Sequence, residues 1–275
     1  MDLELQSVLE YGAANTAKLL NQGFSDYIVP IHIGLEQFYG MLRYDSIDIT
    51  SSRVVIREGK GVGAALIARR GWNSRLAGMA ILPDARGQGV GRGLMKALID
   101  EAKKRGDCRM ELEVIEQNSP AVYLYQNAGF SILRRLVSYR LENPAGESAP
   151  IEEIDLRAMG RLVNSFGISD MPWQVSGETL VQFGPPFKAY AYKDAYVAIS
   201  SPEAPQISLR SMLIMPDAQK KGQGDKLLKG LFAQYPEKTW LVPAIFPEEF
   251  GGIFEKGGFA KEKLSQYQMV LAFMG

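Results

Sequence analysis

"PDARGQGVG" (83–91) and "PDAQKKGQG" (216–224) are two similar glycine-rich loops within one chain of 275 residues. The sequence around them also matches, because "MAILPDARGQGVGRGLMKAL" (79–98) aligns with "MLIMPDAQKKGQGDKLLKGL" (212–231) at an offset of 133 residues. Further along, "YQNAGF" (125–130) aligns with "FEKGGF" (254–259) at an offset of 129. Two matches in the same order indicate an internal duplication.

The two copies are separated by "NPAGESAP" at residues 143–150, which holds two prolines and a glycine and has no apolar periodicity. Such a stretch predicts a linker. We therefore expect one domain over residues 1–142, a linker over 143–150 and a second domain over 151–275. The single cysteine, Cys108, excludes an intrachain disulfide and is expected to be buried as a small apolar residue.

Composition and charge narrow the class of protein. Hydrophobic residues make up 46% and charged residues 23% of the chain, which is typical of a globular protein with a buried core. The formal net charge of zero argues against a protein that binds nucleic acid by neutralising phosphates. No apolar run approaches the roughly 18 residues of a membrane span, and the N-terminus lacks the features of a secretory signal. We expect a cytoplasmic protein without nucleic-acid or membrane partners.

The first copy has a consistent order of expected elements. Strand-like runs at 52–58, 61–70 and 74–83 are broken by glycine turns and predict an antiparallel meander. Apolar residues then recur every four positions from Val90 to Ala102, as in an amphipathic helix. A strand over 108–116 is expected to place Leu112 on one face and Glu113 on the other.

A short helix and a strand are expected to complete this copy. In "SPAVYLYQNAG" (119–129), Ser119 can cap the helix, Pro120 suits its first turn and Gly129 can end it. The run "FSILRRLVSYRLE" (130–142) predicts the strand that closes the first half.

The loop at 83–91 lies between an expected strand and an expected helix, where backbone N–H groups and the helix dipole favour a phosphate. It is not a P-loop, because no Lys-Ser or Lys-Thr pair follows the glycines. It does not fit the dinucleotide fingerprint G-x-G-x-x-G either, because Arg92 or Leu94 stands at the third glycine position. A glycine turn without any ligand remains an alternative for this loop taken alone.

Two motifs in order resemble the GNAT superfamily of acyl-CoA N-acyltransferases. The first is R-x-x-G-x-G, formed by Arg86, Gly89 and Gly91. The second is N-x-x-A-x-x-L-Y-x-x-x-G-F, formed by Asn118, Ala121, Leu124, Tyr125, Gly129 and Phe130. The resemblance covers residues 1–142 and repeats more weakly over 151–275. It implies an α/β protein with two tandem GNAT folds, each a mixed, mostly antiparallel sheet flanked by helices.

The resemblance also implies acetyl-CoA as co-substrate, with no metal, and assigns roles to residues. Backbone groups of the loop would hold the pyrophosphate, and those of the preceding strand would line the pantetheine arm and polarise the thioester carbonyl. The implied cofactor-binding residues are Met79, Ala80, Ile81, Arg86, Gly87, Gln88, Gly89, Val90, Gly91, Arg92, Asn118 and Tyr125. Tyr125 would protonate the leaving thiolate, and Asn118 would contact the cofactor or a bound water. The alternative for Tyr125 is a core aromatic.

The chemistry also asks for a proton acceptor when the acceptor amine is basic. Freeing a lysine-like amine at pH 7 costs about 4.6 kcal/mol, whereas an α-amine costs only about 1 kcal/mol. Glu113, five residues before Asn118, resembles the proton acceptor of the branch that acetylates ribosomal proteins. Alternatively, Glu111 and Glu113 form a solvated strand face. His32, Phe24, Tyr27 and Trp72 are further candidates for lining a pocket, for which a loop or core position is an equally simple explanation.

The second copy keeps the loop pattern (Gln219, Gly222, Gly224) but not the side chains that carry chemistry. At the offset of 129, Glu113 becomes Val242, Asn118 becomes Pro247 and Tyr125 becomes Phe254. We therefore expect the second domain to be a degenerate, non-catalytic GNAT fold. It would make the chain either a monomer with an internal pseudo-dimer or a homodimer.

The favoured function is an acyltransferase that moves an acetyl group from acetyl-CoA to a primary amine, with its active site in the first domain. A small-molecule amine or a peptide N-terminus would be the acceptor, and an O-acyl acceptor stays open. The alternative is a non-catalytic acyl-CoA-binding or regulatory protein.

Overall fold

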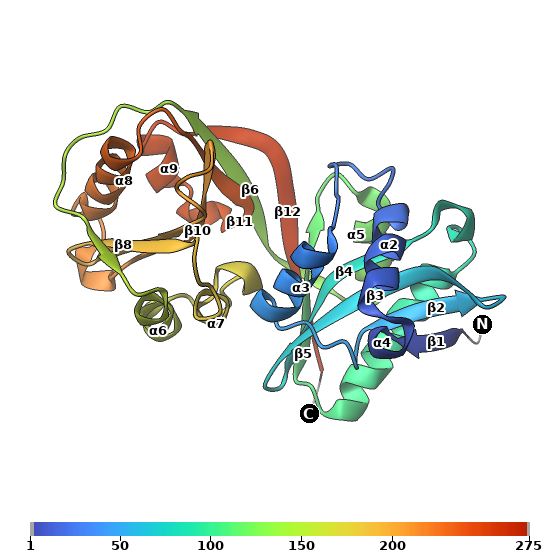
Figure 1. Ribbon diagram of the computed structural model, residues 1–275. Coiled ribbons are helices and arrows are strands. Elements are labelled where there is room, and N and C mark those ends of the chain that lie inside the picture. The colour runs from blue at the N-terminus through green and yellow to red at the C-terminus, as the bar shows by residue number, and fades with distance from the viewer. Residues whose placement is uncertain (1–2, 274–275) are drawn as a thin grey trace. The chain divides into compact units, whose positions relative to one another are not determined.

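The computed structural model describes residues 3–273, and the chain divides into two compact units (Figure 1). Unit 1 consists of Met1–Leu133 together with Tyr267–Gly275, and unit 2 consists of Arg134–Gln266. The division therefore falls within two long strands, β6 (Ser131–Glu142) and β12 (Ala260–Ala272), whereas the sequence suggested residues 143–150.

The sheet of unit 1 runs in the order β1-β2-β3-β4-β5-β12. The meander expected over 52–83 is confirmed as antiparallel β2, β3 and β4, while β5 pairs with β4 in parallel. The bounds of the strands are β1 (Glu4–Ser7), β2 (Arg53–Arg57), β3 (Lys60–Arg70), β4 (Asn73–Ile81) and β5 (Arg109–Ile115). The bounds of the helices are α1 (Val8–Tyr11), α2 (Ala13–Gly23), α3 (Leu35–Tyr44), α4 (Val90–Arg105) and α5 (Ser119–Asn127).

Helices α2 and α4 cover opposite faces of this sheet (Figure 1). The alternation of side chains along β4 explains this arrangement, because Ala80 faces α2 while Met79 and Ile81 face the start of α4. Small residues permit the close approach on both faces. A Cβ added at Gly23 of α2 would lie 2.7 Å from the Cβ of Ala80, and one added at Gly91 of α4 would touch Met79 and Ile81.

The last strand of the chain completes unit 1 beside β5. The Phe273 N–H donates to the Cys108 carbonyl at 2.8 Å, and the Tyr267 hydroxyl donates to Glu116 at 2.8 Å. Met269 is fully buried in the core of this unit. The strand expected to close the first half, β6, instead pairs with β11 (Thr239–Pro247) of unit 2, where Tyr139 lies opposite Val242. The sequence could not show this exchange because the position beside β5 is filled by a segment about 130 residues further along the chain.

Unit 2 repeats the architecture with the sheet order β6-β11-β10-β9-β8-β7 and a parallel pair β10–β11. The bounds of its strands are β7 (Glu152–Ile154), β8 (Lys188–Tyr192), β9 (Ala195–Ile199) and β10 (Gln206–Ile214). The bounds of its helices are α6 (Leu156–Phe166), α7 (Gly177–Leu180), α8 (Gln223–Gln234) and α9 (Gly252–Lys256). The segment 143–150 lies along α8, where the Glu147 N–H donates to the Lys229 carbonyl and Gly146 packs closely on Ala233.

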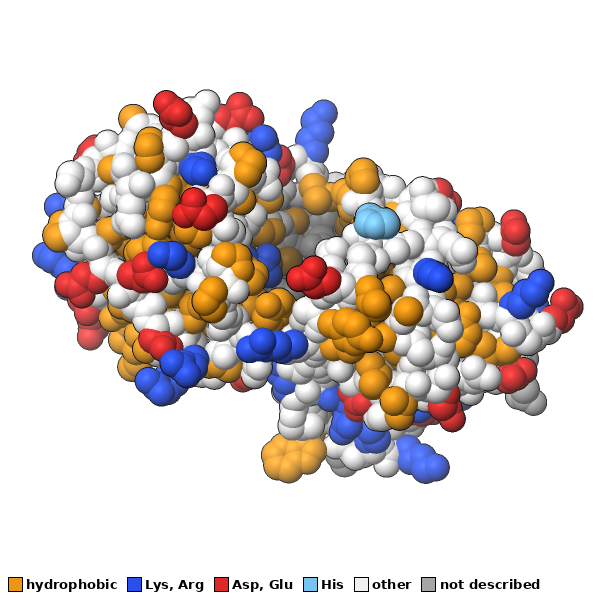
Figure 2. Space-filling view, in the orientation of Figure 1, with side chains coloured by type: hydrophobic (Ala, Val, Ile, Leu, Met, Phe, Trp, Pro, Cys, Tyr) orange, Lys and Arg blue, Asp and Glu red, His pale blue; other side chains and the backbone are white. Residues whose placement is uncertain are grey.

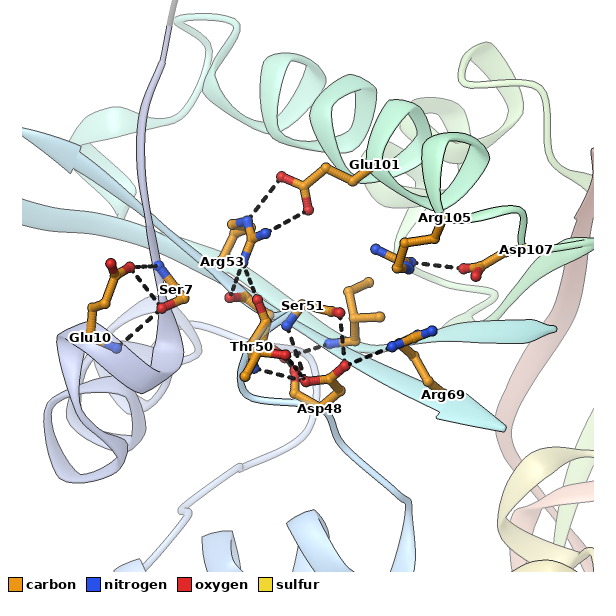
Figure 3. Close-up of polar contacts among 12 residues, drawn as sticks. Ser7, Glu10, Asp48, Thr50, Ser51, Arg53, Arg69, Glu101, Arg105 and Asp107 are labelled. Carbon is orange, nitrogen blue, oxygen red and sulfur yellow. Dashed lines mark hydrogen bonds and ion pairs between the residues drawn. The ribbon is translucent and has the colours of Figure 1, made fainter. Parts of the chain in front are cut away.

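A polar cluster fixes the loop between α3 and β2 (Figure 3). The carboxylate of Asp48 accepts hydrogen bonds from Thr50, from Ser51 and, at 3.1 Å, from Arg69. Partial burial of Asp48 works against its charge, but these donors outweigh it and hold the pKa of Asp48 well below its usual range. The loop is thus held by an ionised carboxylate.

Candidate active site

Strands β4 and β5 separate where the GNAT resemblance expects a thioester to lie. Their pairing runs from Asn73–Arg109 to Leu76–Leu112 and goes no further along the described parts of these strands. At the same point β4 contains a bulge, since Leu66 of β3 lies opposite Gly78 and Ile67 lies opposite Leu76, which leaves Ala77 unpaired. Beyond the bulge, Met79–Ile81 edge an opening in the sheet.

The loop at 83–91 leads from this opening to the N-terminus of α4. Gly87 and Gly89 adopt φ values of 72° and 80°, which favour glycine, and an added Cβ at either would meet nothing within 4 Å. Gly89 is the N-cap of α4, and no side chain caps the helix there. The N–H groups of the first turn are therefore donors for an anion, which the helix dipole also favours.

A cavity of about 320 Å³ joins the opening in the sheet to this helix start. It draws on four segments, which are the end of β4, the glycine loop, the start of α5 and the loop after α2. Of the residues expected to bind the cofactor, it contains Met79, Ala80, Ile81, Arg86, Gly87, Gly91 and Asn118. Its other lining residues are Gly23, Phe24, Asp26, Tyr27, Ile28, Pro120, Ala121 and Leu124.

The remaining expected loop residues lie outside this cavity. Val90 is buried in the core of unit 1, and the side chain of Gln88 accepts from Arg57 at 2.7 Å. Arg92 lines a second cavity of about 520 Å³ between α4 and α5, together with Lys96 and Tyr123. Two basic side chains thus lie along a hollow close to the same helix start.

Arg86 of the first motif joins the glycine loop to the loop after α2. Its guanidinium donates to both carboxylate oxygens of Asp26, at 2.6 and 2.8 Å, and also to the carbonyls of Gly23 and Ile81. The motif residue therefore positions the segment that covers the cavity. Asp26 has no sequence signal that marks it, because it lies 60 residues from Arg86.

Asn118 and Tyr125 lie seven residues apart in the chain, and therefore on one face of α5. The expected cap Ser119 is wrong by one residue, because Asn118 is the N-cap and its side chain accepts from the Ala121 N–H at 3.3 Å. Tyr125 is only 8% exposed and packs edge-on against Phe130. Burial, with a smaller contribution from Tyr27, raises the pKa of Tyr125 well above its usual value.

Glu113 lies inside unit 1 as the partner of Arg75. Two nitrogens of Arg75 donate to the same oxygen, Oε2, each at 2.7 Å, and the two side chains are only 4% and 2% exposed. Burial alone would lower the pKa of Arg75, but the charge of Glu113, aided by Asp45, raises it. The solvated strand face considered for Glu113 is therefore wrong. Glu113 is also not among the residues that line the cavity.

The further candidates for lining a pocket fall into two groups, those that line the cavity and those that lie elsewhere on the surface. Phe24 and Tyr27 line the cavity, whereas Trp72 is 74% exposed and lies apart from it. His32, the single pale-blue side chain in Figure 2, lies at the surface. Cys108 is exposed, so the expected burial is wrong.

Unit 2 has the same backbone features as this site but different side chains inside it. Arg210, at the offset of 133 from Ala77, is the extra residue of a bulge in β10, and Lys220 and Gly222 adopt φ values of 61° and 72° like Gly87 and Gly89. The counterparts Val242 and Phe254 are buried in the core of the unit. An added Cβ at Gly224 would lie 2.5 Å from Ile253, against 3.4 Å from the nearest side chain at Gly91. The hollow is therefore tighter in unit 2.

Residues 3–273 contain no candidate metal site and no candidate membrane-spanning helix. No group of three or more His, Cys, Asp or Glu side chains in this range is arranged to hold a metal ion. None of the helices in the same range combines the length and the apolar character that a membrane crossing requires.

Comparison with known proteins agrees with this geometry. Residues 26–130 match the model of the acetyltransferase (GNAT) family. The streptothricin acetyltransferase of Streptomyces lavendulae is 37% identical over 76 residues, which are 27% of this chain and 40% of that protein. The ribosomal protein bS18-alanine N-acetyltransferase of Escherichia coli (strain K12) is 45% identical over 56 residues, which are 20% of this chain and 38% of that protein. The chain thus spans about two fifths of the length of these relatives.

Solved structures extend the likeness over both units. A GCN5-related N-acetyltransferase from Sphaerobacter thermophilus has a TM-score of 0.71 at 13% identity and covers 98% of this chain and 95% of its own. A tandem GNAT protein from the clavulanic acid biosynthesis pathway has a TM-score of 0.67 at 14% identity and covers 98% of each chain. At such low identity these likenesses show the fold. Residues 26–130 thus match the acetyltransferase (GNAT) family, and the two units of the chain have the fold of a tandem GNAT protein.

Proposed function

We propose that the protein is an N-acetyltransferase that moves the acetyl group of acetyl-CoA to a primary amine, with its active site in unit 1. One observation carries the proposal. The opening between β4 and β5 and the uncapped N-terminus of α4 meet in a single cavity, so a thioester and a pyrophosphate can be held together there. Gly87 and Gly89 leave the space beside the helix start free of side chains, which fits a bound phosphate.

The residues of unit 1 divide the chemistry between them. Backbone N–H groups beyond the bulge at Ala77 would stabilise the negative charge that develops on the thioester oxygen. Tyr125 would supply a proton to the leaving sulfur. Asn118, which lines the cavity, would contact the cofactor or a bound water. Glu113 is the proposed proton acceptor, with Oε2 held by Arg75 and Oε1 without a hydrogen-bond partner in the structure.

The second cavity suits the nucleotide end of the same co-substrate. Its lining includes Arg92 and Lys96, and the first turn of α4 lies next to it. Lysine and arginine side chains are the usual partners of phosphate groups. We propose that the phosphates are held by the helix start and that Arg92 and Lys96 add the electrostatic attraction.

Unit 2 is proposed to be non-catalytic. Val242, Pro247 and Phe254 provide no proton donor or acceptor where unit 1 has Glu113, Asn118 and Tyr125. The position of Ile253 beside Gly224 also narrows the space that a pantetheine arm would need.

The acceptor is a small-molecule amine or a peptide N-terminus, as the names of the two relatives suggest for those proteins. The test is release of CoA, followed with a thiol reagent, from the full chain with acetyl-CoA and a panel of acceptors. The panel contains small primary amines, peptides with a free N-terminus, lysine side chains and alcohols. We expect turnover with at least one amine and a loss of about 10- to 10,000-fold in Tyr125→Phe. Tight acetyl-CoA binding without turnover on any acceptor would instead identify a non-catalytic acyl-CoA-binding protein.

A further inference from the structure

Gly78 is a glycine that the fold of unit 1 does not require. It lies inside strand β4, where a glycine weakens the sheet because it has no side chain to pack. Most glycines of unit 1 either adopt a positive φ or lie so close to a neighbour that an added Cβ would touch it. Gly78 does neither, because its φ is not positive and an added Cβ would meet nothing within 4 Å. The missing side chain therefore leaves an open space beside the strand.

This open space lies on the face of the sheet that carries α2. Side chains alternate along β4 beyond the bulge, so Gly78 lies on the face opposite to Met79, which faces α4. On the face of Gly78, the next side chain is Ala80, which is buried under Gly23 of α2. Residues 77–79 are partly exposed between buried neighbours. The sheet is therefore accessible from this face at the point where β4 and β5 separate.

The buried pair Arg75–Glu113 closes the other end of the open space. Leu76 belongs to the core under α4, so Arg75 beside it lies on the same face as Gly78, and its ion pair places Glu113 of β5 there too. The side chain of Glu113 is 2% exposed, and its Oε1 has no hydrogen-bond partner in the structure. An amine over Gly78 would thus lie between the proposed proton acceptor and the opening in the sheet.

Unit 2 carries a side chain at the equivalent position. Ser211 is the counterpart of Gly78 at the offset of 133 residues, and it also directly follows a bulge. Its side chain is buried and donates to the Val175 carbonyl at 2.8 Å, so the short 3₁₀ helix Trp173–Val175 covers it. The bulge therefore does not require a glycine. The space is filled in the unit that lacks the proposed catalytic side chains and is open in the unit that has them.

We propose that Gly78 is a specificity-determining residue, which leaves room for an acceptor whose primary amine is attached to a branched carbon. This inference rests on the proposed acetyltransferase function. The end of a lysine side chain is a slim CH₂ group, whereas a branched carbon carries two substituents beside the amine and needs a wider site. Between Ala80 and Arg75, the absent side chain of Gly78 supplies that width. A larger residue at this position would occupy the room for the second substituent.

The first test asks whether the fold needs this glycine. Gly78→Ala is expected to unfold at the wild-type temperature or above it, because alanine fits the backbone without strain and meets no neighbour. Gly63→Ala in β3 is the matched control, since an added Cβ there would lie 3.1 Å from the Ala80 carbonyl oxygen and closer still to Ile81. This control is expected to unfold at a lower temperature. Equal losses in the two variants would assign Gly78 to packing and overturn the inference.

The second test measures selectivity by calorimetry and needs no turnover. The probes are two conjugates in which the sulfur of CoA is joined through a CH₂–CO group to the nitrogen of glycinamide or of alaninamide. They differ by one methyl group on the carbon that carries the nitrogen. The wild-type full chain is expected to bind both with similar affinity. Gly78→Val is expected to bind the alaninamide conjugate about 10- to 200-fold less tightly than the glycinamide conjugate, with Gly78→Ala between the two proteins.

The controls separate this inference from the proposed function. Affinity for CoA itself should be unchanged in Gly78→Val, and Gly252→Val, at a glycine of unit 2 that also has no neighbour within 4 Å, should behave as wild type. Equal affinity of Gly78→Val for the two conjugates, or a similar preference for the glycinamide conjugate in the wild type, overturns the inference. The expected selectivity without turnover on any amine overturns the proposed function alone. A wild-type protein that binds neither CoA nor the conjugates overturns both.

Discussion

The buried pair Arg75–Glu113 offers a sharp test of the structure. Glu113→Gln keeps the shape of the side chain but removes the carboxylate charge that pairs directly with the guanidinium of Arg75, in a site where the two side chains are 4% and 2% exposed. Removing one partner of such a pair costs about 3–5 kcal/mol. At about 2–4 °C per kcal/mol for a protein of 150–250 residues, the midpoint of thermal unfolding should fall by roughly 6–20 °C.

A matched control lies in the same unit (Figure 3). Glu101 also binds an arginine through two nitrogens, those of Arg53 at 2.9 Å, but the exposed fractions are 20% and 30%. Glu101→Gln is therefore expected to cost at most about 1 kcal/mol, as exposed pairs do. Thermal and guanidinium unfolding followed by circular dichroism measure both variants. Equal losses in the two variants, or a loss of less than about 1 kcal/mol in Glu113→Gln, would refute the reasoning.

The double variant Arg75→Met/Glu113→Leu separates folding from catalysis. Apolar side chains of similar size are expected to restore most of the stability, because neither leaves a charge uncompensated. The carboxylate is not restored. If Glu113 is the proton acceptor, the stable double variant remains slow with a lysine-like amine, whereas recovered turnover would assign Glu113 to folding alone.

Four further outcomes are expected. Gly89→Glu should abolish most of the acetyl-CoA affinity measured by calorimetry, because it places a negative charge at the helix start, while the control Gly71→Glu, also at positive φ with no neighbour within 4 Å, should leave it intact. Gly222→Glu, in unit 2, should leave turnover largely unchanged. An inactive but folded variant would mean that unit 2, and not unit 1, carries the active site. Asp48→Asn should lower the free energy of unfolding at pH 7. The difference from wild type should shrink below pH ~4, because a carboxyl whose pKa is lowered in the folded state stabilises the fold at higher pH and loses this effect as it becomes protonated. A fragment 1–142 should unfold at lower temperature than the full chain, because it lacks residues 267–272 of β12. Addition of a peptide with that sequence should raise the midpoint of thermal unfolding of the fragment. A fragment as stable as the full chain would contradict the strand exchange.

The duplication, the glycine loop and the order of strands and helices could be predicted from the sequence because each depends on local chemistry. A helix stripe such as Val90 to Ala102 is set by the period of the α-helix, and Gly89 stands where the backbone needs a positive φ. The GNAT motifs likewise occupy short, continuous stretches. The motifs alone therefore assign Asn118 and the glycine loop to one site.

Contacts between distant segments could be decided only by the tertiary structure. Arg86 meets Asp26 across 60 residues and Arg75 meets Glu113 across 38, and neither pairing leaves a periodic pattern in the chain. The bulge at Ala77 depends on register with β3, and the place of β12 beside β5 depends on competition with β6 for the same edge. Hydrogen-bonded sheet edges accept any strand of suitable pattern, so the sequence specified the strands while the packed structure selected their partners.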